Sequence, residues 1–254
     1  MACLSRNRSF DSGVGPFPSV GKCQMRISCR VAFIEHVCVM TLRPFCDCIY
    51  LERIDAKPDA GLLAYLLPDV IERAESFLSP KRQSDFLWTR LLLVALGKVR
   101  GLAVQFRENP PYSPVVLFDS PLYSTISHTA TFVGAALATS PVAIDLEVLR
   151  ADRPLEAIAE RCFGPFFLSY FPPEEKVTAF YKAWGVHECA VKLNGKFSVD
   201  GSIVRIRMPD NRGIRIVHAP IGKNTLFTQA LAADFRPGDS ILVTREILAQ
   251  MLAS

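Results

Sequence analysis

The sequence lacks a long apolar run. No uninterrupted apolar stretch reaches the roughly 18 residues that a membrane-spanning helix needs. The nearest candidate, Phe86–Val99, is interrupted by Arg90 and Lys98. We therefore expect this stretch to form a buried helix, and we expect no membrane insertion.

The sequence also lacks the cysteine spacings of zinc and redox sites. Six of the eight cysteines precede residue 50, but Cys46 and Cys48 are separated by one residue rather than two, and no Cys-His cluster follows. No secretory signal accompanies them, so the even count does not argue for disulfides. We expect reduced thiols in a cytoplasmic protein.

The sequence lacks a large excess of either positive or negative charge. The net charge is +4 over 254 residues, half of which are apolar and a fifth charged. That composition is typical of a globular chain of one or two domains. The modest positive charge suits an anionic ligand or an acidic partner, and it is too diffuse to indicate nucleic-acid binding.

The first 40 residues differ from the rest. They are rich in Ser, Gly and Pro, and up to Arg30 they hold five bases and one acid, Asp11. They could be a transit peptide, or an untranslated leader before a true start at Met40. We favour the leader, because a fold-like pattern begins just after it, and in either case we predict disorder.

The remaining chain predicts an α+β fold in two halves, residues 41–139 and 140–254. The main expected elements fall in chain order. They are a strand at 46–54, a helix at 69–77, a helix begun by Ser79-Pro80 and running to Val99, a loop at 107–121, a strand at 132–138, a strand at 140–147, a helix at 153–163, a helix at 180–195, a β-meander over 202–235 and a last helix at 247–253.

The helix FYKAWGVHECAVKLNG, residues 180–195, carries the first candidate site residues. Phe180, Trp184, Glu188 and Lys192 are four apart and share one face. Because Glu188 shares this face with the aromatic residues Phe180 and Trp184, we expect its carboxylate either to be solvated or to contact a cation. The plain alternative is a Glu-Lys pair on a solvated helix face. Asn194-Gly195 suits a left-handed helix end.

Two further segments carry polar groups. In SPVAIDLE, Asp145 and Glu147 project from one face of a strand, and two neighbouring carboxylates call for a cation, a proton or open water. They form the single acid-x-acid pair of the sequence, and a solvated strand face is the alternative. Ser127-His128 forms a polar turn before an apolar run, where a lone His is often structural.

Together, in order and spacing, these three segments resemble the 4′-phosphopantetheinyl transferases of the broad-specificity type, which act on acyl and peptidyl carrier proteins. The family pattern is a Ser-His turn, a Gly-Ile-Asp-Ile-Glu strand and a Trp-x-x-Lys-Glu-x-x-x-Lys helix. It matches Ser127-His128, the segment 143–147 and the segment 184–192. The resemblance is strongest over 127–195 and extends more weakly to about Leu67. It implies two pseudo-symmetric halves and a monomer.

The resemblance also implies a reaction and its residues. The phosphopantetheine arm of coenzyme A would pass to a carrier-protein serine, and adenosine 3′,5′-bisphosphate would leave. Asp145, Glu147 and Glu188 would hold Mg²⁺, an ion that prefers oxygen ligands. Glu188, Lys192 and Asp145 would be catalytic, with Glu188 also accepting the serine proton and Lys192 neutralising phosphate charge.

Coenzyme A would be bound by His128, Arg90 and Lys192, with Arg82 as a further candidate. An alternative for Arg90 is that it snorkels from an apolar helix. Two positions depart from the pattern: Ala143 replaces the Gly, and His187 replaces the Lys before the helical Glu. His187 removes a fixed charge.

Two other functions stay open at this point. The chain could bind coenzyme A or a carrier protein without turnover, or it could be a different metal-dependent phosphotransferase that takes a nucleotide.

Overall fold

The computed structural model describes residues 43–107, 114–117, 122–235 and 240–254, which belong to one compact unit. The leader predicted over residues 1–40 and much of the loop predicted over 107–121 lie outside the described residues. The predicted α+β class is confirmed. Among the described residues, no helix is both long and apolar enough to cross a membrane.

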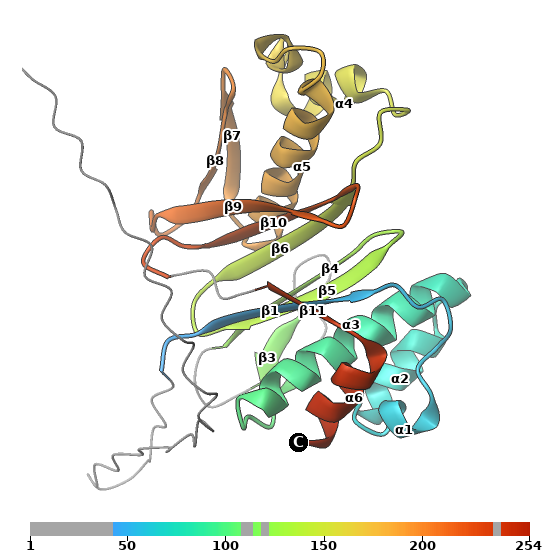
Figure 1. Ribbon diagram of the computed structural model, residues 1–254. Coiled ribbons are helices and arrows are strands. Elements are labelled where there is room, and N and C mark those ends of the chain that lie inside the picture. The colour runs from blue at the N-terminus through green and yellow to red at the C-terminus, as the bar shows by residue number, and fades with distance from the viewer. Residues whose placement is uncertain (1–42, 108–113, 118–121, 236–239) are drawn as a thin grey trace, which may run out of the picture. The chain divides into compact units, whose positions relative to one another are not determined.

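The first half packs helices on one sheet (Figure 1). Its elements are β1 Cys46–Glu52, α1 Ala60–Leu63, α2 Pro68–Glu75, α3 Pro80–Val99, β2 Gln105–Arg107, β3 Val115–Leu117, β4 Tyr123–His128 and β5 Phe132–Ala138. The described strands lie in the order β11-β1-β5-β4-β3-β2, where β11 is the C-terminal strand Ser240–Val243. As predicted, the Ser79 hydroxyl caps α3, with Pro80 in the first turn.

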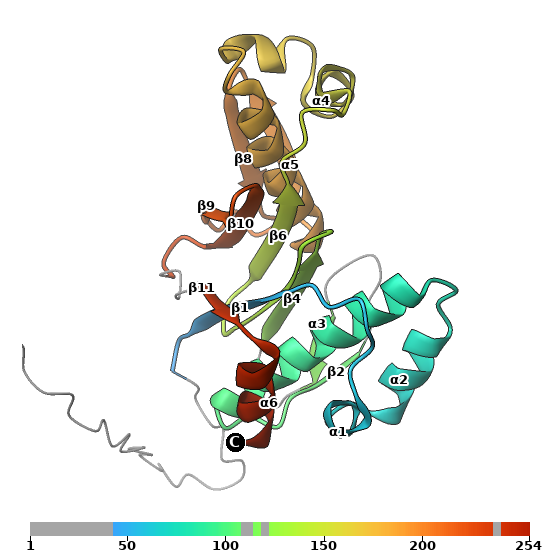
Figure 2. The same cartoon turned by 45° about the vertical axis from the view of Figure 1, so that its right-hand side comes forward.

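The second half holds the motif helix. Its elements are β6 Val142–Val148, α4 Leu155–Phe163, the 3₁₀ helix η1 Phe167–Tyr170, α5 Lys176–Lys192, β7 Lys196–Asp200, β8 Ile203–Arg207, β9 Ile214–Ile221 and β10 Thr225–Ala232. The described strands form a sheet β6-β10-β9 and a separate hairpin β7-β8. Both Figure 1 and Figure 2 show this hairpin beside α5.

The two halves share one topology. In the first, β1 is followed by α3, β4 and β5, and β5 pairs antiparallel with both β1 and β4. In the second, β6 is followed by α5, β9 and β10, and β10 pairs antiparallel with both β6 and β9. The last strand of each set is therefore central, as expected for two pseudo-symmetric halves.

The C-terminal segment returns to the first sheet. Strand β11, Ser240–Val243, pairs parallel with β1, and helix α6, Arg245–Ala253, buries Leu248 and Leu252 in the core of the first half. Neither the return nor β11 was predicted, and α6 begins two residues before the predicted helix. The division at residues 139/140 stays a prediction.

Two expectations about the strands were wrong. The residues after Gly195 do not form one meander, because β7 and β8 pair with each other while β9 and β10 join β6. Strand β3 lies inside the stretch predicted as loop and pairs with β2 and β4.

Helix α5 follows its prediction closely at its C-terminal end. It ends at Lys192, and Asn194 takes the left-handed conformation with φ 54°. Phe180 is buried, and Trp184 stacks on it with 6.0 Å between ring centroids. The next two residues of this face, Glu188 and Lys192, are half-buried.

Helix α5 approaches β10 most closely at Gly185. A Cβ placed there would lie 2.3 Å from Thr228 Oγ1 and 2.8 Å from Thr228 Cβ. A larger residue must therefore push the helix away from the sheet that carries Asp145.

We expect Gly185→Ala to lower the free energy of unfolding by about 1–3 kcal/mol, the usual cost of overpacking, although alanine is the better helix former. In a Thr228→Ala background the same change should cost less, because the closest atom is gone. Urea unfolding measures both, with the exposed Lys182→Ala as a control on the same helix. Equal costs in the two backgrounds would contradict the contact.

Candidate functional site

The three predicted motifs meet at Asp145. This carboxylate projects from β6 and is 5% exposed. Its Oδ1 accepts hydrogen bonds from Ser127 Oγ on β4 at 3.2 Å and from Lys192 Nζ on α5 at 3.1 Å. Lys192 Nζ also donates to the Ile144 carbonyl at 2.7 Å. Segments from both halves of the chain are thus tied to one buried acid.

Hydroxyl groups on β4 hold β6 in place. The Ile144 and Leu146 N–H groups donate to Thr125 Oγ1 at 3.3 Å and to Ser127 Oγ at 3.0 Å. Backbone donors buried between the halves are thereby satisfied by side chains. Ser127-His128 ends strand β4 rather than forming the predicted turn, so Ser127 orients Asp145 from a rigid element.

We expect Ser127→Ala to lower the free energy of unfolding by about 1–3 kcal/mol, because it leaves the buried Leu146 N–H without its acceptor. Ser127→Thr keeps the hydroxyl and should recover part of the loss. Urea unfolding tests this, with the exposed Ser202→Ala as a control. An unfolding midpoint for Ser127→Ala equal to that of the wild type would refute the role given to this hydroxyl.

Glu147 and Glu188 lie within electrostatic range of each other. Burial raises the pKa of Glu147 to about 7, and the charges of Asp145 and Glu188 act in the same direction. Arg153 and a hydrogen bond from Trp184 oppose them. The site therefore holds several carboxylates close together. Glu147 lies on β6 and Glu188 on α5, and both are half-buried.

Lys192 supplies the positive charge that faces these carboxylates. Burial acts to lower the pKa of Lys192, but Asp145, Cys189 and Glu188 outweigh it, and the pKa is raised above its usual value. The ammonium group is therefore charged at neutral pH. The ammonium donates to the Ile144 carbonyl and to Asp145 Oδ1, both on β6, so Asp145 engages it directly.

The residues fit a divalent ion in their chemistry. Asp145 Oδ2 is buried and has no hydrogen-bond partner among the described residues. The three acids offer the hard oxygen ligands that Mg²⁺ prefers. No group of three or more His, Cys, Asp or Glu side chains in the described ranges already stands as a ligand set. Mg²⁺ and its three ligands stay a prediction.

His128 stands among cations. His128 is exposed at the end of β4, yet the protein around its ring desolvates it enough to lower the pKa of His128; Asp85 opposes the shift, while Lys192, Lys81 and Arg90 add to it. Arg90 does not snorkel to solvent, since it is 5% exposed. Its guanidinium lies 3.7 Å from the Phe86 ring centroid. This group of cations suits an anion.

Two other residues lie elsewhere. Arg82 is exposed and covers the Phe77 ring, with 4.5 Å from its guanidinium carbon to the centroid. His187 packs edge-on against Phe197 with centroids 5.0 Å apart and also touches Trp184. The imidazole thus belongs to the aromatic cluster between α5 and the hairpin.

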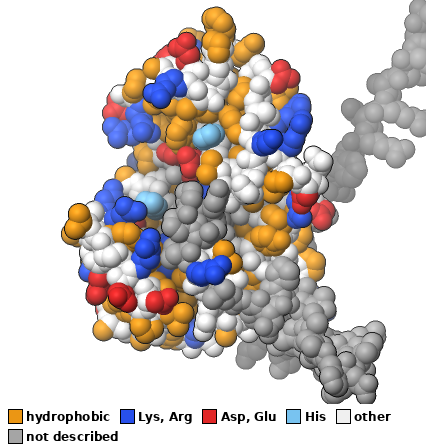
Figure 3. Space-filling model, turned by 180° about the vertical axis from the view of Figure 1, so that it is seen from behind, with side chains coloured by type: hydrophobic (Ala, Val, Ile, Leu, Met, Phe, Trp, Pro, Cys, Tyr) orange, Lys and Arg blue, Asp and Glu red, His pale blue; other side chains and the backbone are white. Residues whose placement is uncertain are grey.

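A cleft of about 650 Å³ adjoins the acid site. Lys192 lines it together with mainly apolar residues, among them Leu122, Val142, Leu193 and Met208. Figure 3 shows acidic side chains beside a histidine on one face, with groups of Lys and Arg side chains around them. A ligand with an anionic part and an apolar part matches these surroundings.

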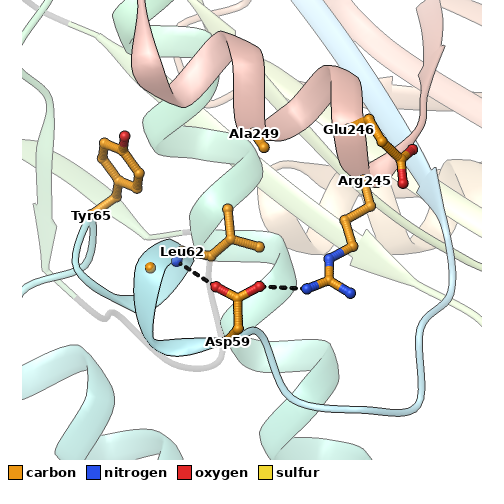
Figure 4. A pocket seen from close by; sticks show the side chains of 7 residues that line it. Asp59, Leu62, Tyr65, Arg245, Glu246 and Ala249 are labelled. Carbon is orange, nitrogen blue, oxygen red and sulfur yellow. Dashed lines mark hydrogen bonds and ion pairs between the residues drawn. The ribbon is translucent and has the colours of Figure 1, made fainter.

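A second pocket, of about 410 Å³, lies between α1 and α6, and its rim carries the ion pair of Asp59 with Arg245 (Figure 4). Asp59 accepts the Leu62 N–H and a hydrogen bond from Arg245. Its pKa is lowered, first by the Leu62 bond and then by Arg245. This pocket contains none of the predicted site residues.

Sequence reasoning missed several residues of the site. Ser127 was expected as part of a motif but not as a hydrogen-bond donor to Asp145, and Trp184 was not expected to act on Glu147. Lys81 and Arg153 were not singled out. Ser127, Trp184 and Lys81 each act on a residue far along the chain, so a local pattern does not reveal them, whereas Arg153 acts on the nearby Glu147.

The fold and site define an α+β protein of two topologically matched halves, with an acidic centre between them. No protein-family model matches the chain. It is similar to the 4′-phosphopantetheinyl transferase of Bacillus subtilis, with 23% identity over 198 residues, covering 73% of this chain and 86% of that protein. The sequence motifs were expected to resemble this same class of protein, and the similarity supports that resemblance.

Proposed function

We propose that the chain transfers the 4′-phosphopantetheine arm of coenzyme A to a serine hydroxyl of an apo acyl or peptidyl carrier protein. The convergence of Ser127 and Lys192 on Asp145 carries this proposal. The similarity to the Bacillus subtilis transferase supports the same general reaction.

The chemistry uses groups that the site already gathers. The serine oxygen attacks the phosphorus that bears the pantetheine arm and forms a new P–O bond. The bond to the bridging oxygen breaks, and adenosine 3′,5′-bisphosphate leaves with the electron pair. Glu188 would accept the serine proton.

Charge on the phosphates needs neutralisation. His128, Arg90 and Lys192 would contact the phosphates, with Arg82 as a more distant candidate. Asp145, Glu147 and Glu188 would hold Mg²⁺ through carboxylate oxygens. The ion, when bound, would supply positive charge at the diphosphate, as in other phosphoryl transfers. The protein's share is positioning and electrostatic stabilisation.

The test is to incubate the chain with coenzyme A, Mg²⁺ and an apo carrier protein, and to weigh the carrier by intact mass spectrometry. We expect the carrier to gain the mass of one phosphopantetheine group, and the gain to vanish with Asp145→Ala. Binding of coenzyme A without a gain would instead indicate a non-catalytic binder. Binding of a nucleotide in preference to coenzyme A would indicate another phosphotransferase.

A further inference from the structure

The outer face of the β7–β8 hairpin carries three cations, Lys196, Arg205 and Arg207, and one acid, Asp200, at the turn end. The register places Lys196 directly opposite Arg207 and Ser198 opposite Arg205. All four side chains are exposed. None of the three cations forms an ion pair with an acid in the described part of the chain.

The pairing of Lys196 with Arg207 works against the hairpin. Like charges directly opposite each other on two strands destabilise the sheet. The inner face does not need these residues, because Phe197 and its neighbours pack on α5. A like-charge pair on a rigid exposed face is stabilised when an anionic partner covers it.

This basic end borders the cleft of about 650 Å³ that Lys192 lines. Leu193 and Asn194, just before Lys196, line the cleft, as do Met208 and Pro209, just after Arg207. Lys192 lines the same cleft and bonds to Asp145. The cation pair therefore stands at the rim of the cleft that Lys192 lines.

The position points to a protein rather than to a small anion. In the proposed function coenzyme A is bound by the cations near His128. The acceptor serine, in contrast, arrives on the surface of a protein, and that surface must contact the rim of the cleft. At the other end of the hairpin the half-exposed Ile203 lies opposite the acid Asp200. A partner that covers this face therefore meets positive charge at the Lys196–Arg207 end, next to the cleft.

We infer that the Lys196–Arg207 end of the hairpin docks carboxylates on the surface of the acceptor carrier protein, an inference that rests on the proposed function. Such rim charges steer encounter and add to affinity. The double variant Lys196→Gln/Arg207→Gln should raise the KM for the carrier about tenfold at low salt, while the KM for coenzyme A stays unchanged.

The control removes the same charge elsewhere, with Arg161→Gln/Lys223→Gln at exposed positions on α4 and on the β9–β10 turn. This control should keep the wild-type KM for the carrier. The thermal midpoint of the hairpin variant should not fall, because a repulsive pair has been removed. A loss of carrier affinity through unfolding would lower that midpoint.

Binding is measured separately from turnover by calorimetry with an apo carrier whose acceptor serine is replaced by alanine. We expect the hairpin variant to bind it about tenfold more weakly than the wild type. If the wild type loads carriers and the hairpin variant binds as tightly, this inference fails alone. If the wild type neither binds nor loads any carrier, the proposed function fails. Loss of binding to anionic vesicles or duplex DNA, with carrier binding intact, would overturn the assignment of the partner.

Discussion

Replacing Asp145 with asparagine is expected to abolish carrier loading, lowering kcat/KM by about 10²–10³ or more, the usual cost of removing a key electrostatic group. The same change should lower the free energy of unfolding by about 3 kcal/mol, because it leaves the ammonium of Lys192 buried without its carboxylate. The two side chains are 7% and 16% exposed. Kinetics and urea unfolding measure the two effects.

A second variant separates chemistry from folding. In Asp145→Asn/Lys192→Met both charges are gone, so much of the stability should return, since replacing a whole buried pair is often nearly neutral. The activity should not return. Asp152→Asn serves as the matched control, because Asp152 forms an exposed pair with Arg150. An Asp145→Asn protein that loads the carrier at the wild-type rate would contradict the role proposed for Asp145.

Replacing Glu188 with glutamine is expected to lower kcat by about 10²–10⁴, the range for a lost general base. The cost in stability should be small, because glutamine keeps the shape of a half-buried side chain and relieves repulsion with Glu147. The measurement is kcat across pH and across Mg²⁺ concentration, with the exposed Glu174→Gln as control.

The two roles proposed for Glu188 give different results. If it accepts the serine proton, kcat falls in the variant while the Mg²⁺ concentration for half-maximal rate stays unchanged. If it is mainly a ligand, that concentration increases. A variant whose pH profile, Mg²⁺ dependence and kcat all match those of the wild type would exclude Glu188 from the reaction.

The sequence predicted those parts of the fold that depend on local pattern. The alternation in SPVAIDLE corresponds to β6, the Ser79-Pro80 pair begins α3, and Asn194 follows the end of α5 in the left-handed conformation. Each of these depends on neighbouring residues alone.

The missed elements depend on distant partners. Strand β11 is four residues long and exists because it lies parallel to β1, about 190 residues earlier in the chain. Strand β3 is formed by pairing within a proline-rich stretch. Short strands of this kind carry no periodic signal of their own, so only tertiary contacts reveal them.

The site shows the same division. The motifs named Asp145, Glu188 and Lys192, and the structure ties Asp145 to Lys192. Ser127 Oγ accepts a hydrogen bond from the Leu146 N–H and donates one to Asp145. This double role was not predicted, because it arises only where β4 and β6, from different halves, face each other.

The central claim, that Asp145, Glu147 and Glu188 hold one divalent ion at the diphosphate of coenzyme A, is tested most directly with Mn²⁺. This ion shares the oxygen preference of Mg²⁺, and electron paramagnetic resonance reports its free concentration. We expect one Mn²⁺ per chain to disappear from the free signal when coenzyme A is present, beyond the amount that coenzyme A binds alone, and we expect Asp145→Asn to lose this binding. Wild-type protein that loads a carrier while taking up no Mn²⁺, or an Asp145→Asn protein that takes up as much as the wild type, would contradict the account.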